Sequence, residues 1–220
     1  GKKLKGSIKV TPAKNAYLPI LAGCILSEKP IILHDCPNYI DIINMNKILA
    51  NLGGNIDFNE KNLIVDCSSL NSSSIPHDLA SVLRSSIFSL GSILGRFKHA
   101  KVAYPGGCEI GARPIDLHIK GLKALNVKII DKHGYLTCDG RNMRGARVNL
   151  DFPSVGATEN IMLAAVLTKG ETEIINAAKE PEIIDLANFL NSLGAKISGA
   201  GTSTIKIIGV KKLNGGEYTP

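Results

Sequence analysis

A glycine-rich stretch in the middle of the sequence brings a thiol close to an arginine and to the start of a helix. Residues 104–114 contain three glycines within six positions, and Cys108 lies among them. Arg113 stands directly before Pro114, and proline is favoured in the first turn of a helix. Because a helix N-terminus presents free N–H groups and a positive dipole end, Arg113 indicates an anion site. Cys108 is either a reactive thiol or a passive loop cysteine, and both interpretations stay open.

Two other helix starts carry residues that suit an anion. Lys14 and Asn15 precede an apolar run, and Asn15 is expected to cap the helix that this run forms. Ser154, Val155 and Gly156 begin another helix, with Ser154 as the capping residue. A solvated lysine and a plain cap are the simplest interpretations, but free N–H groups at both starts could also receive an anion.

Arg84 and His118 give weaker signals. Arg84 lies within a helix predicted over residues 77–97, where it either meets an anionic partner or extends to solvent. His118 is expected to be a surface or capping histidine rather than a catalytic residue. The five histidines show no HxxxH or HExxH spacing, so no metal site is predicted.

A repeated pattern specifies the elements that must position these residues. At three places a helical stretch ending in leucine leads to a turn residue and then to an alternating strand. The turn residues are Gly53, Asn126 and Gly194, which lie 73 and 68 positions apart. Glycine and asparagine tolerate the left-handed backbone found just beyond a helix end. The pattern therefore predicts three repeat units. They cover about residues 14–70, 77–140 and 146–210.

Each unit is predicted to follow the order β-α-β-α-β-β, which places the fold in the α/β or α+β class with mixed sheets. The first helices are expected at 15–27, 77–97 and 155–168, and the second helices at 38–52, 112–125 and 180–193. The intervening strands are expected at 31–34, 101–104 and 172–175. The closing hairpins are expected at 55–58 with 63–66, 127–130 with 135–138, and 196–198 with 204–208. No GxGxxG, P-loop or GxSxG pattern indicates a dinucleotide, nucleotide-triphosphate or hydrolase site.

The repeat also predicts where the candidate residues meet. A pseudo-threefold arrangement of units would point the N-terminal ends of the first helices the same way. Lys14 and Asn15 would then share one anion site with the start of the helix at 154–156. Arg84, Cys108 and Arg113 could complete this basic, helix-lined site.

The composition narrows the class of partner. Lysine and arginine number 26 against 19 acidic residues, and the net charge of +7 suits nucleic acid or any anionic small molecule. The basic residues are scattered and there is no tryptophan, so nucleic acid is not the expected partner. Five cysteines without a CxxC pair favour a reducing cytoplasm over a disulfide framework. No apolar run approaches the roughly 18 residues of a membrane span, so no membrane is expected as a partner either.

Residues 106–119, Gly-Gly-Cys-Glu-Ile-Gly-Ala-Arg-Pro-Ile-Asp-Leu-His-Ile, resemble the cysteine loop of the UDP-N-acetylglucosamine 1-carboxyvinyltransferases of the enolpyruvyl transferase family. The likeness extends over essentially the whole chain and includes residues 13–16, 154–158 and 176–183. The family builds each of its two domains from three β-α-β-α-β-β units. The resemblance therefore implies a first domain over residues 14–218, in pseudo-threefold arrangement. It also implies that residues 1–13 form a strand belonging to a second domain.

The resemblance implies a role for each matching residue. The positions matching the family's substrate-binding residues are Lys14, Asn15, Arg84, Arg113, Pro114, Ile115, Asp116, Leu117, Ser154, Val155 and Gly156. Lys14 and Asn15 resemble the pair that holds phosphoenolpyruvate. Arg84 resembles the arginine that contacts the UDP-sugar, and Arg113 resembles a phosphate-binding arginine. Residues 114–117 match the uridine site and residues 154–156 match a diphosphate site. Cys108 resembles the general acid, and a largely protonated thiol can donate a proton near pH 7.

The reaction that the resemblance implies needs no cofactor. The enolpyruvyl group of phosphoenolpyruvate passes to the 3′-hydroxyl of UDP-N-acetylglucosamine and phosphate is released, which is the first committed step of peptidoglycan synthesis. In the family a second domain supplies an essential aspartate and further arginines. We therefore expect the present chain to be half of the enzyme, with little or no turnover by itself.

One departure from the family pattern leaves an alternative open. Phe152 stands where the family often has a basic residue before Ser-Val-Gly, so one diphosphate contact is in doubt. The alternative is a catalytically inactive half-enzyme that serves as a nucleotide-sugar or partner-binding module. A basic repeat protein that binds nucleic acid is a third hypothesis.

Overall fold

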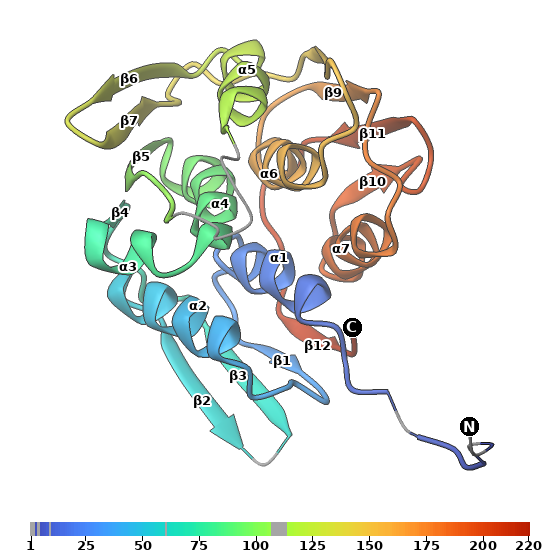
Figure 1. Cartoon of the computed structure of the whole chain (residues 1–220). Helices are drawn as coiled ribbons and strands as arrows, with labels where there is room; N and C mark the ends of the chain where they lie inside the picture. Colours follow the sequence, from blue (N-terminus) through green and yellow to red (C-terminus); the bar gives the residue numbers. More distant parts are fainter. Residues whose placement is uncertain (1–2, 4, 9, 60, 107–113) are drawn as a thin grey trace.

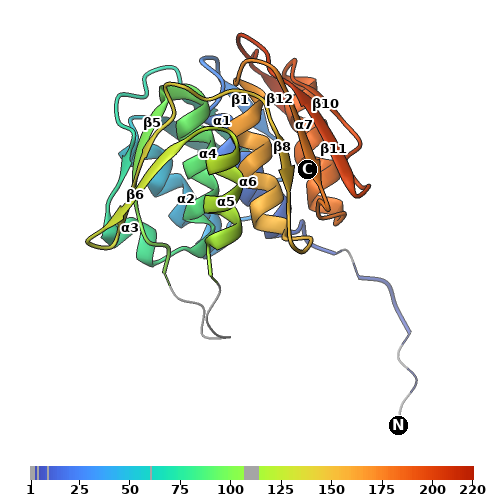
Figure 2. The ribbon, with the colours of Figure 1, turned by 90° about the horizontal axis from the view of Figure 1, so that it is seen from above.

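Three sheets surround a bundle of helices in the computed structural model of the chain, which describes residues 3, 5–8, 10–59, 61–106 and 114–220 (Figure 1). Each sheet has four strands, in the orders β12-β1-β3-β2, β4-β5-β7-β6 and β8-β9-β11-β10. Helices α1, α4 and α6 occupy the centre, and the helices α4, α5 and α6 run side by side in the second view (Figure 2). This is the mixed α/β class that the sequence predicts.

The three units follow one plan. Unit one contains α1 (Lys14–Cys24), β1 (Ile31–Leu33), α2 (Ile40–Asn51), β2 (Asn55–Asn59) and β3 (Asn62–Asp66). Unit two contains β4 (Ser74–Ile75), α3 (His77–Ser81), the 3-10 helix η1 (Arg84–Ile87), α4 (Phe88–Phe97), β5 (His99–Ala103), α5 (Asp116–Ala124), β6 (Lys128–Lys132) and β7 (Tyr135–Asp139). Unit three contains β8 (Arg147–Asn149), α6 (Val155–Val166), β9 (Glu171–Ile175), α7 (Pro181–Ser192), β10 (Lys196–Ser198) and β11 (Thr204–Ile208), and β12 (Gly216–Tyr218) follows it.

The same pairing pattern recurs in every sheet. A short edge strand pairs parallel with the strand between the two helices, and the hairpin completes the sheet antiparallel. In unit one the edge strand is β12, which pairs with β1 in the register Ile31↔Gly216 and Leu33↔Tyr218. The C-terminal strand thus closes the first sheet and makes the arrangement of units cyclic.

The turn residues behave as the repeat predicts. Gly53, Asn126 and Gly194 have φ values of 101°, 67° and 101° and follow α2, α5 and α7. A left-handed residue at this point ends a helix and directs the chain into the next strand. The predicted hairpins are also present, and both strands of the third one have the predicted bounds.

The prediction of one long helix over 77–97 is wrong. The structure breaks it into α3, η1 and α4, and Leu83 has extended backbone with φ −141° and ψ 112°. The carbonyl of Ala80 accepts hydrogen bonds from the Gly106 N–H at 2.9 Å and from the Ser86 hydroxyl at 3.4 Å. Because these groups take a carbonyl that a continuous helix would use, the chain can leave the helix after α3.

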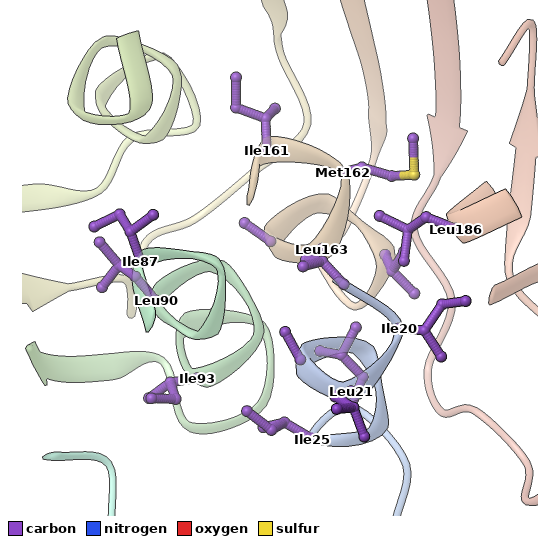
Figure 3. Close-up of a cluster of buried hydrophobic side chains, with 14 of the residues drawn as sticks. Ile20, Leu21, Ile25, Ile87, Leu90, Ile93, Ile161, Met162, Leu163 and Leu186 are labelled. Carbon is purple, nitrogen blue, oxygen red and sulfur yellow. The ribbon is translucent and has the colours of Figure 1, made fainter. Parts of the chain in front are cut away.

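The core lies between the three central helices, with apolar side chains from each (Figure 3). Leu21, Leu90 and Leu163 are fully buried there. Helices α4 and α6 approach closely because α4 carries glycine at the contact, and a Cβ at Gly91 would lie 2.2 Å from the Asn160 carbonyl oxygen. Within the described ranges no helix is long and apolar enough to cross a membrane.

Candidate functional site

A cavity of about 830 Å³ lies at the N-terminal ends of the helices. Residues from α1, α2, η1, α4, α5, α6 and α7 line it, so every unit contributes to its wall. Of the predicted site residues, those lining it are Lys14, Asn15, Arg84, Pro114, Asp116, Leu117, Ser154, Val155 and Gly156. Cys108 and Arg113 lie outside the residues that the structure describes.

Helix α1 places a lysine and an asparagine in its first turn. Ala13 takes the capping position and its carbonyl accepts from the Ala16 N–H at 3.1 Å, so the prediction that Asn15 caps the helix is wrong. The helix begins one residue earlier than expected, which places both Lys14 and Asn15 inside the first turn. The Lys14 ammonium forms an ion pair with Asp41 of α2, and half of the lysine side chain is exposed. The lysine therefore remains accessible to a ligand in the cavity.

The broken helix of unit two delivers an arginine to the cavity. Arg84 is the first residue of η1, immediately after the extended residue Leu83, rather than a residue inside a long helix. Ser85, Ile87 and Phe88 line the cavity beside it. The break in the helix thus turns the backbone so that an arginine stands at the cavity wall.

The start of α5 contributes a mixed segment. Pro114 lies before the helix rather than in its first turn, because the Ile115 carbonyl accepts the first helical hydrogen bond, from the Ile119 N–H at 3.0 Å. Asp116 and Leu117 line the cavity, whereas the side chain of Ile115 is 7% exposed and packs into the core.

The start of α6 is capped as the sequence predicts. The Ser154 hydroxyl oxygen accepts a hydrogen bond from the Ala157 N–H at 3.4 Å. A Cβ at Gly156 would lie 3.1 Å from Phe88 and 3.2 Å from His118, so the glycine leaves the space that these rings occupy. The missing side chain thus lets both rings lie against the first turn of α6 at the cavity wall.

His118 is buried, so the expectation of a surface or capping histidine is wrong. It lines the cavity and its side chain hydrogen-bonds Asn160 of α6. Burial, and then the charge of Arg84, lower the pKa of His118 to about 4, while Asp116 acts in the opposite direction. The imidazole is therefore neutral at pH 7.

Of the acidic residues that line the cavity, the sequence predicts Asp116 alone as a site residue. Each second helix carries one carboxylate in its first turn, namely Asp41, Asp116 and Glu182, and all three line the cavity. Alignment of the three units would have revealed this repeated position. Glu159 of α6 adds a fourth, and burial together with the charges of Glu182 and Glu180 raises its pKa well above the usual range.

The cavity therefore combines cations and helix N-termini with carboxylates, and it is not the uniformly basic site that the sequence suggests. Cations and free N–H groups suit phosphate groups, and carboxylates suit the hydroxyl and N–H groups of a sugar or base. No cluster of three or more potential metal ligands occurs among the described residues.

Comparison with known proteins gives one consistent result. The family described as EPSP synthase (3-phosphoshikimate 1-carboxyvinyltransferase) matches residues 1–219. The UDP-N-acetylglucosamine 1-carboxyvinyltransferase 2 of Caldanaerobacter subterraneus subsp. tengcongensis is 53% identical over 219 residues, which cover 100% of this chain and 52% of that protein. The UDP-N-acetylglucosamine 1-carboxyvinyltransferase of Finegoldia magna is 50% identical, over 98% of this chain and 52% of its own length. The chain thus spans about half the length of these relatives.

Solved structures share the fold at much lower sequence identity. The enolpyruvyl transferase NikO from Streptomyces tendae has a TM-score of 0.85 and 20% identity, over 100% of this chain and 52% of that chain. An EPSP synthase from Acinetobacter baumannii has a TM-score of 0.77 and 16% identity, over 97% and 49% of the two chains. With three repeated units, the shared fold and a family match over nearly every residue, the chain belongs to the EPSP synthase family of enolpyruvyl transferases.

Proposed function

We propose that this chain forms one half of a UDP-N-acetylglucosamine 1-carboxyvinyltransferase and binds the nucleotide sugar and phosphoenolpyruvate in its helix-end cavity. The observation that carries the proposal is the cavity itself, which gathers Lys14, Arg84 and the start of α6 in a chain 53% identical to a relative of that name. Both substrates carry negative charge, which the two cations and the free N–H groups of α6 would bind.

The proposed reaction assigns distinct tasks to the cavity residues. The 3′-hydroxyl of the sugar gives up its proton and adds to C2 of phosphoenolpyruvate while C3 takes a proton. Phosphate then leaves from the tetrahedral intermediate as C3 loses a proton, which restores the C2–C3 double bond. Lys14 and Asn15 hold phosphoenolpyruvate, residues 114–117 hold the uridine, and Ser154, Val155 and Gly156 hold the diphosphate. Arg84 contacts the UDP-sugar, Arg113 binds phosphate, and Cys108 supplies the proton to C3.

The remainder of the active site comes from a second domain in this proposal. That domain supplies the base that accepts the hydroxyl proton, so residues 14–218 alone bind substrates without turning them over. The described residues before α1 extend away from the body, and Ile8 and Val10 among them are 91% and 83% exposed (Figure 2). Their alternating positions suit a strand that pairs within the second domain. The reaction would serve peptidoglycan synthesis in the cytoplasm.

Phosphate release tests the proposed function. The relative from Caldanaerobacter supplies the missing half, expressed separately and added to the 220-residue chain with both substrates. Phosphate release that requires both halves supports the proposal, and its loss in Cys108→Ala supports the role of the thiol. Substitution of the buried Cys138 by alanine is the matched control and should leave release per folded molecule unchanged.

The alternative is a binding module without catalytic activity. Phe152 favours it, because this side chain lines the cavity and is 57% exposed where the family resemblance leads one to expect a basic residue. Under this alternative UDP-N-acetylglucosamine binds, but no phosphate appears when the second half is present. A Phe152→Lys variant that binds the nucleotide sugar more tightly and restores release would show that the missing cation accounts for the inactivity.

A further inference from the structure

A buried amide connects three helices at the cavity wall. Asn160 of α6 has no exposed surface. Its Oδ1 accepts a hydrogen bond from the Gly91 N–H of α4 at 2.7 Å, and its Nδ2 lies 3.0 Å from Nδ1 of His118 in α5. One side chain therefore fixes its neighbours on two other helices.

The chemistry of these contacts determines where the proton of His118 resides. A backbone N–H can only donate, so the Asn160 atom that it meets must be the carbonyl oxygen. The other end of the amide is then the NH₂ group, which can only donate, and His118 Nδ1 must accept. In the neutral imidazole the single proton is consequently on Nε2.

The same contacts place Nε2 of His118 beside Gly156 in the first turn of α6. His118 and Gly156 both line the cavity, and Nε2 lies 3.3 Å from the point that a Cβ at Gly156 would occupy. Among the described residues Nε2 has no hydrogen-bond partner, whereas Nδ1 is occupied by Asn160. The imidazole thus presents one N–H donor beside the first turn of α6.

We propose that Asn160 is a positioning residue that holds His118 with its Nε2–H directed into the cavity, as a donor to an acceptor oxygen of the bound ligand. The identity of that ligand, UDP-N-acetylglucosamine, rests on the proposed function. The arrangement prepares the donor before the ligand arrives, because the buried amide cannot rotate without losing its bond from Gly91.

The surroundings favour the neutral ring. Arg84 faces His118 from η1 and disfavours a positive charge, while Asp116 on the same helix as the histidine favours one. Gly156 of α6, which lies against the ring, carries no charge. The net effect lowers the pKa of His118 to about 4, which agrees with a neutral donor at pH 7.

Nitrogen NMR of the imidazole tests the proposal on the full 220-residue chain labelled with ¹⁵N-histidine. The unsubstituted protein should show His118 as the Nε2–H tautomer at pH 7. In Asn160→Asp one carboxylate oxygen still accepts from Gly91, and the other needs a donor, so Nδ1 of His118 should become protonated. Asn44→Asp adds the same charge on α2, where Asn44 accepts from Lys47, and should leave the tautomer unchanged.

A second readout uses UDP-N-acetylglucosamine itself. Binding should weaken by about ten-fold in Asn160→Asp, the loss expected for one hydrogen bond, and should stay within about two-fold of the original in Asn44→Asp. A His118 with its proton on Nδ1 in the unsubstituted chain would overturn the proposal, even if Asn160→Asp fails to fold. So would an unchanged tautomer in a folded Asn160→Asp. Absence of UDP-N-acetylglucosamine binding to the unsubstituted chain would instead reject the proposed function and leave the tautomer result standing.

Discussion

The two ends of the central helices differ in what their side chains do. Toward the C-terminal ends Leu21 of α1, Ile93 of α4 and Leu163 of α6 are buried without exposed surface (Figure 3). At the other end Lys14 of α1, Glu159 of α6 and Arg84 of η1, the short helix before α4, line an open cavity. Apolar burial drives folding, and charged groups at a cavity add little to it or oppose it.

This difference separates apolar packing from the candidate binding groups along one set of helices. The packed end holds the axes in place, so the N-terminal ends can carry groups that are individually unfavourable for folding. Substitutions at the packed end should therefore change stability and leave ligand affinity per folded molecule unaltered. Substitutions at the cavity end should do the reverse, or even stabilise the chain.

Leu163→Ala should have the largest effect on stability. The side chain is fully buried, with its Cδ2 beside Gly23 of α1, and its removal should cost about 3 to 4 kcal/mol of unfolding free energy. Val82→Ala is the control, because Val82 is 57% exposed and its truncation should cost far less. Urea unfolding measures both. Equal losses in the two variants would contradict the assignment of the packed end.

Lowering the pH from 7 to 4 should lower the free energy of unfolding by roughly 3 kcal/mol through the protonation of His118. The pKa of this histidine is about 4 in the folded chain and about 6.5 when unfolded, so below pH 6.5 the unfolded state binds the extra proton. The contribution of His118 is fully present above pH 6.5 and is lost as the pH falls toward 4. Comparison of unfolding between pH 7 and pH 4 in the original chain and in His118→Gln isolates this part. Parallel pH curves would show that burial does not perturb the ring.

Glu159→Gln should stabilise the chain at neutral pH by about 1 to 2 kcal/mol. Oε2 of Glu159 is buried without a hydrogen-bond partner in the described part of the chain, and burial raises the pKa of this carboxyl. A raised pKa means that the folded state retains the proton, so the carboxyl favours folding at low pH and disfavours it as the pH rises. The gain in melting temperature should shrink below the pKa of an unfolded glutamate. A loss of stability at pH 8 would indicate that Glu159 is ionised and paired.

Lys14→Gln should have the smallest effect on stability, within about 1 kcal/mol. The ion pair with Asp41 is half exposed, so water replaces it readily. Phosphoenolpyruvate binding should nevertheless fall by about ten-fold, because a cation at the cavity is removed. Lys211→Gln, an exposed lysine outside the cavity, is the matched control for charge. A similar loss of affinity in both variants would point to a general charge effect instead.

Local signals allow much of the fold to be predicted. Gly53, Asn126 and Gly194 mark helix ends because each position needs a left-handed residue, and the hairpins follow from alternation after these stops. The break at Leu83 escaped prediction because apolar spacing continues across it, while the competing bonds come from Ser86 and from Gly106 further along the chain. The pairing of β12 with β1 escaped prediction because it joins strands from opposite ends of the chain.

Part of the candidate site could also be predicted from local signals. Lys14 and Ser154 could be placed at one end of the fold because the repeat aligns the starts of the helices. Arg84 was expected inside a long helix, and its position at the cavity wall follows from the break at Leu83. The burial of His118 and its contact with Asn160 depend on how α5 packs on α6, which no local pattern encodes. The acidic residues Asp41, Asp116 and Glu182 recur at one position of the repeat, and alignment of the three second helices would have revealed it.

Titration calorimetry with UDP-N-acetylglucosamine tests the central claim most directly. The original chain should bind the nucleotide sugar saturably, and Arg84→Ala should weaken binding at least about ten-fold, the effect of one charged contact. Arg141→Ala is the matched control, because it removes an exposed guanidinium outside the cavity that pairs with Asp139, and it should bind like the original. Affinity unchanged by Arg84→Ala, or lowered equally by both substitutions, would contradict the claim that the helix-end cavity is the nucleotide-sugar site.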